Sequence, residues 1–133
     1  MNPHLFVYGT LLSTAGHPNG KRLRRESRLL GEATIEGKLY NLGRYPGLAE
    51  SPGAGTRVYG EVYALNAPSA SLEWLDAYEG IVPGDHDHNK YARVERPARL
   101  GTGEDLAAWV YVYLKPVAAS CLIAGGRWAP RSR

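Results

Sequence analysis

A run of alternating apolar and polar residues between positions 29 and 39 limits the fold more than any other feature of the sequence. The apolar positions are Leu29, Ala33, Ile35 and Leu39, and the positions between them include Glu32, Thr34, Glu36 and Lys38. Successive side chains of a strand point to opposite faces, so a period of two places these apolar residues on one side. The run therefore predicts a β-strand that turns one face toward the core.

Four more segments have the composition of strands. They are Leu5 to Tyr8, Val58 to Leu65, Tyr91 to Arg99 and Ala107 to Leu114. Residues 101–104, Gly-Thr-Gly-Glu, are typical of a hairpin turn between the last two of these segments. Glycine and proline are frequent from Gly43 to Gly55, which predicts a long irregular connection.

Two segments indicate helices. The clearer one runs from Ser69 to Glu79 and is followed by Gly80, a residue that adopts the positive φ of a helix C′ position without steric cost. Arg22 to Leu30 contains helix-forming residues and a sparse apolar face, which predicts a short exposed helix that leads into the next strand.

The C-terminal segment Cys121 to Trp128 predicts a short helical turn, with Leu122, Ile123 and Trp128 packed on the sheet. Five strands and one or two helices without a regular βαβ alternation indicate an α+β protein with a strongly curved sheet or a small barrel. At 133 residues, the chain is expected to form one domain over residues 1–133.

The net charge of +3 comes mainly from one basic segment. Lys21 to Arg28 contains five basic residues and one acidic residue. Further basic residues near the C-terminus are Arg127, Arg131 and Arg133. Because no aromatic residues are interleaved with the basic ones, we expect Lys21 to Arg28 to form a solvated helix face, and no nucleic-acid partner is predicted. If nucleic acid did bind there, its affinity would fall steeply with salt.

The composition favours a globular protein in the cytoplasm. Hydrophobic residues make up 44% and charged residues 22% of the chain, which are globular averages. The longest apolar run, Leu106 to Leu114, falls well short of the roughly twenty residues that a membrane span needs. A single cysteine, Cys121, and an N-terminus without an export signal fit a reducing compartment.

Glu79 is the first candidate functional residue. In the predicted helix, Leu72, Leu75 and Glu79 stand at positions i, i+3 and i+7, so the carboxylate shares a face with leucines that must be buried. A buried carboxylate has a raised pKa, which suits proton transfer near neutral pH. The alternative is that Glu79 points into solvent or pairs with an arginine such as Arg93.

The second candidate is the turn Tyr8-Gly9-Thr10-Leu11 at the end of the first strand. Successive backbone N–H groups in such a turn can form a concave site for a carboxylate or phosphate. A plain structural turn is the alternative. The chain also contains nine tyrosines, which either fill half-buried strand positions or line a cavity for a polar ligand.

Other clusters predict neither a metal nor a cofactor. Asp85 to His88 reads Asp-His-Asp-His, but adjacent side chains of an extended segment point in opposite directions and no second cluster completes a site. We therefore interpret it as a solvated loop. Residues 101–104 lack the rest of a dinucleotide fingerprint, and Cys121 has no neighbouring histidine that would activate it as a nucleophile.

Six segments together resemble the γ-glutamylcyclotransferase-like family, most closely its small bacterial branch, which is similar to the γ-glutamylamine cyclotransferases and the plant AIG2-like proteins. They occur in the family's order and are Val7-Tyr8-Gly9-Thr10-Leu11, Gly43-Arg44-Tyr45-Pro46-Gly47, Gly60-Glu61-Val62-Tyr63, Leu75-Asp76-Ala77-Tyr78-Glu79-Gly80, Tyr91-Ala92-Arg93 and Trp109-Val110-Tyr111-Val112-Tyr113. The resemblance covers most of the chain and implies a small mixed β-barrel flanked by helices.

The resemblance also implies a reaction. In these enzymes the α-amine of a γ-glutamyl group attacks its own γ-carbonyl, which releases the attached amine and leaves 5-oxoproline. A glutamate in the motif Leu-Asp-x-x-Glu-Gly transfers the proton, a role that falls on Glu79. The Tyr-Gly-Thr-Leu loop, which begins at Tyr8, forms part of the substrate site and binds the glutamyl group through its backbone amides, a role that falls on Gly9, Thr10 and Leu11.

The remaining residues implied by the resemblance are tyrosines. Tyr91 and Tyr113 would line the cavity and hydrogen-bond the substrate, and Tyr45 would form part of the rim. The segment from Ile81 to Lys90 is longer than in relatives, which leaves the range of substrates open. The resemblance implies no cofactor.

Two functional hypotheses therefore stand side by side. The first is an enzyme that cyclises a γ-glutamyl amine or γ-glutamyl amino acid, acting as a monomer or homodimer with a small-molecule substrate as its partner. The second is a binding module of the same fold that holds a small acidic ligand without turnover. A carboxyl group of Glu79 that is tuned toward neutral pH and faces a tyrosine-lined pocket favours the enzyme, whereas a salt bridge to Arg93 or Arg96 favours the binding module.

Overall fold

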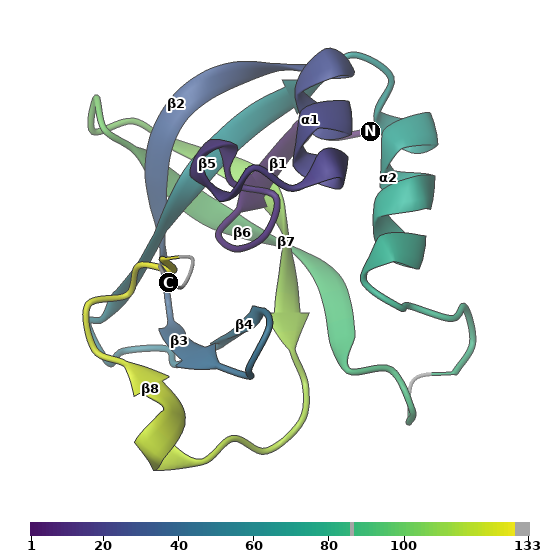
Figure 1. Cartoon of the computed structure of the whole chain (residues 1–133). Coiled ribbons are helices and arrows are strands. Elements are labelled where there is room, and N and C mark those ends of the chain that lie inside the picture. Colours follow the sequence, from purple (N-terminus) through teal and green to yellow (C-terminus); the bar gives the residue numbers. More distant parts are fainter. Residues whose placement is uncertain (86, 130–133) are drawn as a thin grey trace.

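The computed structural model describes residues 1–85 and 87–129, and within them five strands close into a small barrel (Figure 1). In their order around the barrel these strands are β1 (His4–Val7), β5 (Arg57–Leu65), β2 (Ser27–Glu36), β6 (Tyr91–Leu100) and β7 (Asp105–Tyr113). Parallel pairing of Leu5 with Trp109 joins β7 to β1 and closes the ring. The predicted α+β fold with a small mixed barrel is confirmed.

Short strands extend the sheet beyond β7. They are β4 (Pro46–Ala49), β3 (Lys38–Asn41) and β8 (Leu122–Ile123), in that order. The prediction of an irregular connection from Gly43 to Gly55 was wrong for β4. This strand contains a proline and a glycine, both poor strand formers, and it forms because Leu48 pairs with Val112 of β7 while the whole strand pairs with β3.

Strand β2 departs from the simple alternation predicted for residues 29–39. The single strand predicted for this run is two strands, because β2 ends at Glu36 and Leu39 belongs to β3. Ala33, Ile35 and Leu39 are buried, as expected, but Leu29 is 50% exposed. The pairing of β2 with β5 shifts between Leu29 and Gly31. An extra residue in one strand moves every side chain before it to the other face, so the irregularity accounts for the exposed leucine.

Two α-helices cover one side of the barrel in the described part of the chain (Figure 1). Helix α2 (Pro68–Tyr78) matches its prediction, and Gly80 follows it with a φ of 76°. Helix α1 (Pro18–Arg25) begins earlier and ends earlier than predicted. It starts after His17, whose Nδ1 accepts a hydrogen bond from the Asn19 N–H, and residues from Ser27 onward belong to β2. Neither helix is long and apolar enough to cross a membrane.

The C-terminal segment differs from the predicted helical turn. A single 3-10 turn (Ala119–Cys121) leads into β8, which pairs with β3. Ile123 and Trp128 pack on the core as expected, whereas Leu122 is 42% exposed. A short 3-10 turn also occurs at Ser13–Ala15. Arg131 and Arg133 lie outside the described residues.

The pleat of β1 divides the core into two clusters. Phe6 points into the cluster that fills the barrel, together with residues such as Val58 and Val110. Its neighbours Leu5 and Val7 point the other way and join the cluster that contains α1 and α2 residues. Each Å² of apolar surface that is buried contributes roughly 25 cal/mol to stability. Burial of the α2 leucines in this second cluster therefore attaches the helix to the barrel. It therefore fixes where the end of α2 lies.

Candidate active site

Glu79 is held at the C-terminal end of α2. Leu72 is 1% and Leu75 is 0% exposed, so the helix face that the spacing predicted to be buried is buried. The Glu79 N–H donates to the Leu75 carbonyl at 3.0 Å, and the Ile81 N–H donates to the Asp76 carbonyl at 3.0 Å. These bonds and the positive φ of Gly80 end the helix and turn the chain away, which leaves the Glu79 side chain partly buried beside the barrel.

The carboxyl group of Glu79 is tuned toward neutral pH. Burial, with a further contribution from the negative charge of Asp76, raises its pKa from 4.5 to about 7. Within residues 1–85 and 87–129 no ion pair includes Glu79. Both arginines that could have neutralised it have other partners, because Arg93 pairs with Asp76 and Arg96 pairs with Glu50.

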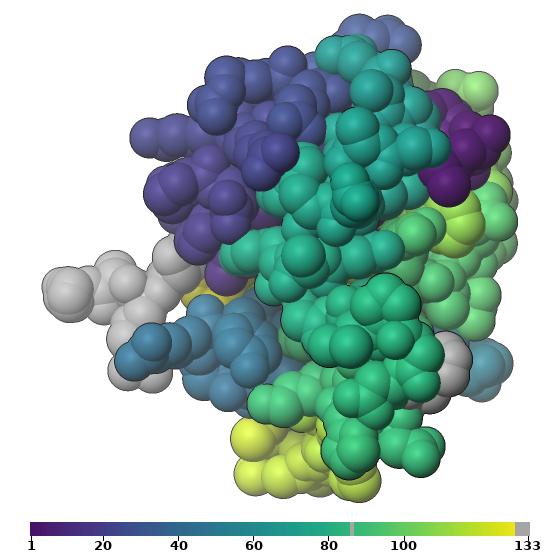
Figure 2. Space-filling view, turned by 90° about the vertical axis from the view of Figure 1, so that its right-hand side faces the viewer, coloured from purple at the N-terminus to yellow at the C-terminus, as the bar shows by residue number. Residues whose placement is uncertain are grey.

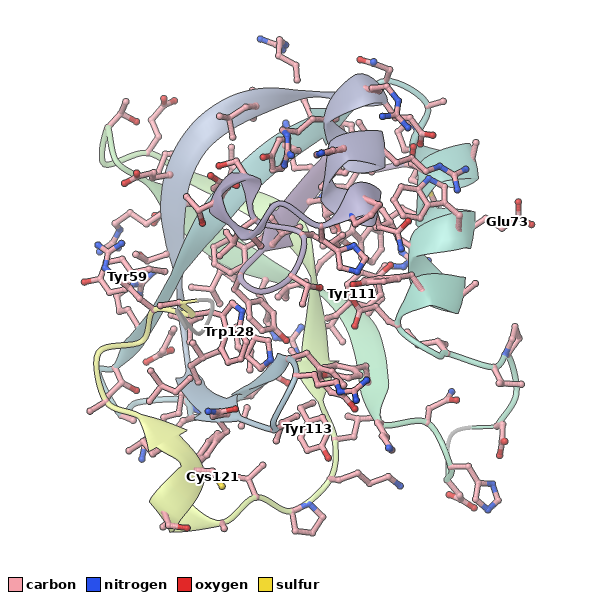
Figure 3. All side chains as sticks on the ribbon, in the orientation of Figure 1. Tyr59, Glu73, Tyr111, Tyr113, Cys121 and Trp128 are labelled. Atoms are coloured by element: carbon pink, nitrogen blue, oxygen red, sulfur yellow. The ribbon has the colours of Figure 1, made fainter. Side chains whose placement is uncertain are left out.

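Asp76, one turn before Glu79, is the centre of a network that sequence reasoning missed. Arg93 donates from Nε to Oδ1 at 2.8 Å and from Nη2 to Oδ2 at 3.1 Å. The Tyr111 hydroxyl donates to Oδ1 at 2.6 Å, and Figure 3 shows Tyr111 beside the end of α2. The Arg93 guanidinium also lies 4.5 Å from the centre of the Trp109 ring. The network ties the end of α2 to β6 and β7.

Glu79 opens into a cavity of about 490 Å³, a size typical of small-molecule sites. Figure 2 views the molecule from the side of α2, with residues 81–85 and 87–90 below the helix. The lining residues are Thr10, Tyr45, Tyr78, Glu79, Gly80, His88, Lys90 and Tyr91. Of the residues predicted for the site, Thr10, Tyr45, Glu79 and Tyr91 are thus brought together here.

A smaller hollow of about 40 Å³ adjoins the cavity at the turn after β1. Tyr8, Gly9, Thr10 and Leu11 line it together with Glu79, so Thr10 and Glu79 belong to both spaces. The Leu12 N–H donates to the Gly9 carbonyl at 3.0 Å and closes the turn. In the described part of the chain, no acceptor pairs with the backbone N–H groups of Thr10 and Leu11.

The position of this turn depends on a glycine. A Cβ atom at Gly9 would lie 2.8 Å from both Cγ and Cδ of Pro46, closer than such atoms approach in proteins. Glycine therefore lets the turn pack directly on β4. On its other side, the Thr10 hydroxyl lies 2.6 Å from the Tyr78 hydroxyl of α2. These contacts bring the turn and the end of the helix to opposite sides of one space.

The predicted tyrosines have different positions. The Tyr8 hydroxyl donates to the Tyr111 carbonyl at 2.7 Å and accepts from the Leu48 N–H at 3.1 Å, and Tyr8 lies outside the lining of the larger cavity. The Tyr91 hydroxyl donates to the Pro46 carbonyl at 2.9 Å. Burial raises the pKa of both phenols, so both remain neutral donors.

The rings of Tyr45 and Tyr113 both lie near that of Tyr91. Tyr45 is 40% exposed and lines the cavity, with its ring centre 6.4 Å from that of Tyr91. Tyr113 packs edge-on against Tyr91 at 5.2 Å but is not among the lining residues. Tyr113 thus supports the ring of Tyr91 without lining the cavity.

The segment from Val82 to Lys90 contains cavity residues that sequence reasoning missed. Its Asp-His-Asp-His run was interpreted as a solvated loop; His86 lies outside the described residues, and the His88 ring contacts Asp85 at 2.7 Å. His88 and Lys90 line the cavity. The unusual length of this segment was the signal that could have identified them. Within the described residues, no three His, Cys, Asp or Glu side chains gather in a way that could hold a metal ion.

The fold and the cavity define a small-barrel protein that presents one carboxyl group of raised pKa to a tyrosine-lined pocket. Comparison with known proteins places it more narrowly. The family model described as gamma-glutamyl cyclotransferase, AIG2-like, matches residues 5–130. The chain belongs to this family, as the sequence motifs predicted.

The relatives match along nearly the whole chain. The gamma-glutamylcyclotransferase family protein YtfP of Escherichia coli is 37% identical over 131 residues, which cover 97% of this chain and 98% of the relative. The corresponding protein of Citrobacter rodentium is also 37% identical, with 97% of each chain covered. Among solved structures, a mouse AIG2-like protein has a TM-score of 0.69 at 24% identity, covering 98% of this chain and 97% of the other. At this identity the likeness shows the fold alone.

Proposed function

We propose that this protein is a γ-glutamyl cyclotransferase, which converts a γ-glutamyl amine or γ-glutamyl amino acid into 5-oxoproline and a free amine. The observation that carries the proposal is the Glu79 carboxyl group, which has a pKa of about 7, no ion pair among the described residues, and a place in a cavity. Family membership supports the same class of reaction.

Glu79 would act as the general base and then as the general acid. The attacking α-amine of a γ-glutamyl group is mostly protonated at neutral pH, so it loses one proton to solvent before attack and a second proton to Glu79 as the new bond forms. A carboxylate with a pKa of about 7 is half ionised near neutral pH and is a far stronger base than an ordinary glutamate. Such proton transfer typically contributes about 10² to 10⁴ in rate.

The reaction needs neither water nor a protein nucleophile. The nitrogen of the neutral α-amine forms a bond to the γ-carbonyl carbon, and its proton passes to the Glu79 carboxylate. The resulting tetrahedral intermediate then breaks the bond between that carbon and the leaving nitrogen. Glu79 returns the proton to the leaving nitrogen, which departs as a neutral amine and leaves the five-membered lactam.

The turn after β1 would hold the glutamyl group in a bent conformation. The backbone N–H groups of Thr10 and Leu11, which have no acceptor in the described part of the chain, can donate to its oxygens. Tyr91 would form the wall of the site and Tyr45 its rim. Holding the amine and the carbonyl in a reactive geometry can lower the barrier by several kcal/mol, because ring closure otherwise costs conformational entropy.

Release of 5-oxoproline from a panel of γ-glutamyl amines, γ-glutamyl amino acids and γ-glutamyl-ε-lysine tests the proposal. We expect turnover by the native protein and a loss of at least about 10²-fold in Glu79→Gln. Glu73→Gln is the matched control, because Glu73 is exposed on the same helix and points away from the barrel (Figure 3).

Each alternative result has a definite meaning. No turnover by the native protein on any of these substrates would favour the binding module, with Glu79 as part of a ligand site. Equal turnover by the native protein and Glu79→Gln would show that another group transfers the proton.

A further inference from the structure

The larger cavity carries positive charge that the proposed chemistry does not use. Besides Glu79, its lining contains two basic side chains, His88 and Lys90, and both come from the segment after α2. Neither lines the smaller hollow beside the turn after β1. The basic groups therefore belong to one part of the site.

Lys90 is placed by the backbone of a well-bonded loop. Its carbonyl accepts a hydrogen bond from the Leu114 N–H at 2.7 Å, and the next residue, Tyr91, opens β6 by pairing with Tyr113. Asn89 is buried and closes the loop from inside, because its side chain accepts from the Val82 N–H at 3.0 Å and donates to the Val82 carbonyl at 3.1 Å. The backbone of Lys90 is thus anchored directly to Leu114 and, through its neighbour Asn89, to Val82.

The charge of Lys90 is not neutralised by the loop itself. His88 contacts the carboxylate of Asp85 at 2.7 Å. For Lys90, no carboxylate oxygen within residues 1–85 and 87–129 lies close enough to form an ion pair, and this includes the Glu79 carboxylate in the same cavity. An ammonium group beside a partly enclosed space favours an anionic ligand there.

A γ-glutamyl substrate of the proposed reaction would occupy both hollows, with one part in each. Its α-amine must reach Glu79, and its α-carboxylate is attached to the same carbon atom as that amine. Both therefore lie where the hollows meet, at Glu79 and Thr10, close to the backbone amides of the turn. The leaving group, attached to the other side of the γ-carbonyl carbon, would then extend into the larger cavity, which Lys90 lines.

We propose that Lys90 determines specificity by binding a carboxylate on the leaving group, so that the substrates are γ-glutamyl amino acids or peptides rather than γ-glutamyl amines without an acidic group. This inference rests on the function proposed above and narrows it. A cationic leaving group, such as a polyamine, would meet repulsion from the same side chain.

A pair of substrates that differ by one charge tests the inference. γ-Glutamyl-alanine has a carboxylate on its leaving group, and γ-glutamyl-alaninamide does not. The ratio of their kcat/KM values is measured for the native protein and for Lys90→Met, and comparing the two ratios cancels the different intrinsic reactivity of the two compounds. Lys21→Met, at an exposed position on α1 outside every cavity described above, is the control.

We expect the ratio of acid to amide to fall about fivefold in Lys90→Met, the upper range for an exposed ion pair, and to stay unchanged in Lys21→Met. In Lys90→Glu the ratio should fall further, and γ-glutamyl-putrescine, with its cationic leaving group, should become a better substrate. The charge reversal provides a second test that does not depend on loss of activity.

Three results would overturn the inference. An unchanged ratio with normal turnover would mean that Lys90 does not contact the leaving group, and would leave the cyclotransferase proposal intact. Equal losses on acid and amide would show that Lys90 acts on the glutamyl part or on the fold. Absence of turnover by the native protein on both compounds and on the wider panel would overturn the proposed function together with this inference.

Discussion

Replacing Glu79 by glutamine should stabilise the folded protein, by an amount that depends on pH. The glutamate is ionised in the unfolded chain above its ordinary pKa of 4.5, but burial keeps it protonated in the folded protein up to a pKa of about 7. Between these values the folded state binds more protons than the unfolded state, so the free energy of unfolding decreases as the pH rises. Glutamine carries no such proton and lacks this dependence.

The size of the effect follows from the shift in pKa. Each pKa unit corresponds to about 1.4 kcal/mol, so the shift from 4.5 to about 7 predicts a destabilisation of the native protein of up to about 3 kcal/mol at alkaline pH. Below about pH 4.5 both states are protonated, and the penalty disappears. The Glu79→Gln protein should therefore match the native protein near about pH 4 and exceed it by up to about 3 kcal/mol near about pH 8.

Urea denaturation of both proteins at several pH values measures this difference. The urea midpoints of the native protein and Glu79→Gln should move apart as the pH rises. The m-values should stay the same, because the same surface is exposed on unfolding. Glu73→Gln should change the free energy of unfolding by less than about 0.5 kcal/mol throughout, since Glu73 is exposed. A difference between native and Glu79→Gln protein that does not vary with pH would refute the reasoning that burial raises this pKa.

Three further predictions follow from the geometry of the site. Asp76→Asn removes the negative charge next to Glu79 and releases Arg93, so it should lower the pKa of Glu79. The rising limb of the pH profile of kcat/KM should therefore move to lower pH. A limb that stays in place would show that Asp76 does not raise the pKa of the base. Gly9→Ala places a Cβ 2.8 Å from Pro46, so it should lower stability by about 1–3 kcal/mol and turnover by at least about tenfold. The control is Gly125→Ala, whose Cβ would meet no atom within 4 Å. It should change neither thermal unfolding nor activity appreciably. Leu75→Ala, at a position with 0% exposure, should cost about 2–5 kcal/mol in urea denaturation, and a smaller loss would mean that α2 is attached mainly by other contacts.

The Asp76 network explains why Arg93 does not pair with Glu79. Arg93 was a natural candidate partner for Glu79 in the sequence, but both of its donors go to Asp76, which is also bound by Tyr111. A bidentate pair with an added hydroxyl donor satisfies the arginine, so the nearby cation does not neutralise the base. Asp76 and Glu79 lie in one sequence motif. In the structure, Asp76 ties the helix to β6 and β7, whereas Glu79 faces the cavity.

Sequence patterns predicted the features that depend on local periodicity. The spacing of Leu72, Leu75 and Glu79 follows from the helix repeat alone, and the burial of both leucines bears it out. The helix end at Gly80 follows from the conformational freedom of glycine. The motifs also predicted the family, because they are spread along most of the chain.

Features that depend on contacts between distant residues were decided by the tertiary structure. Strand β4 has weak strand propensity and exists because it pairs with β3 and β7. Leu29 is exposed because β2 and β5 change register beside it, which a regular alternation does not reveal. Arg93 of β6 pairs with Asp76 of α2. Lys90, which precedes β6, lines the same cavity as Glu79, which follows α2. Both arrangements depend on how separate elements pack together. The sequence thus determined the five barrel strands, helix α2 and the side of α2 that is buried. Closure of the barrel determined which charges meet, because electrostatic partners are set by distance in space and not along the chain.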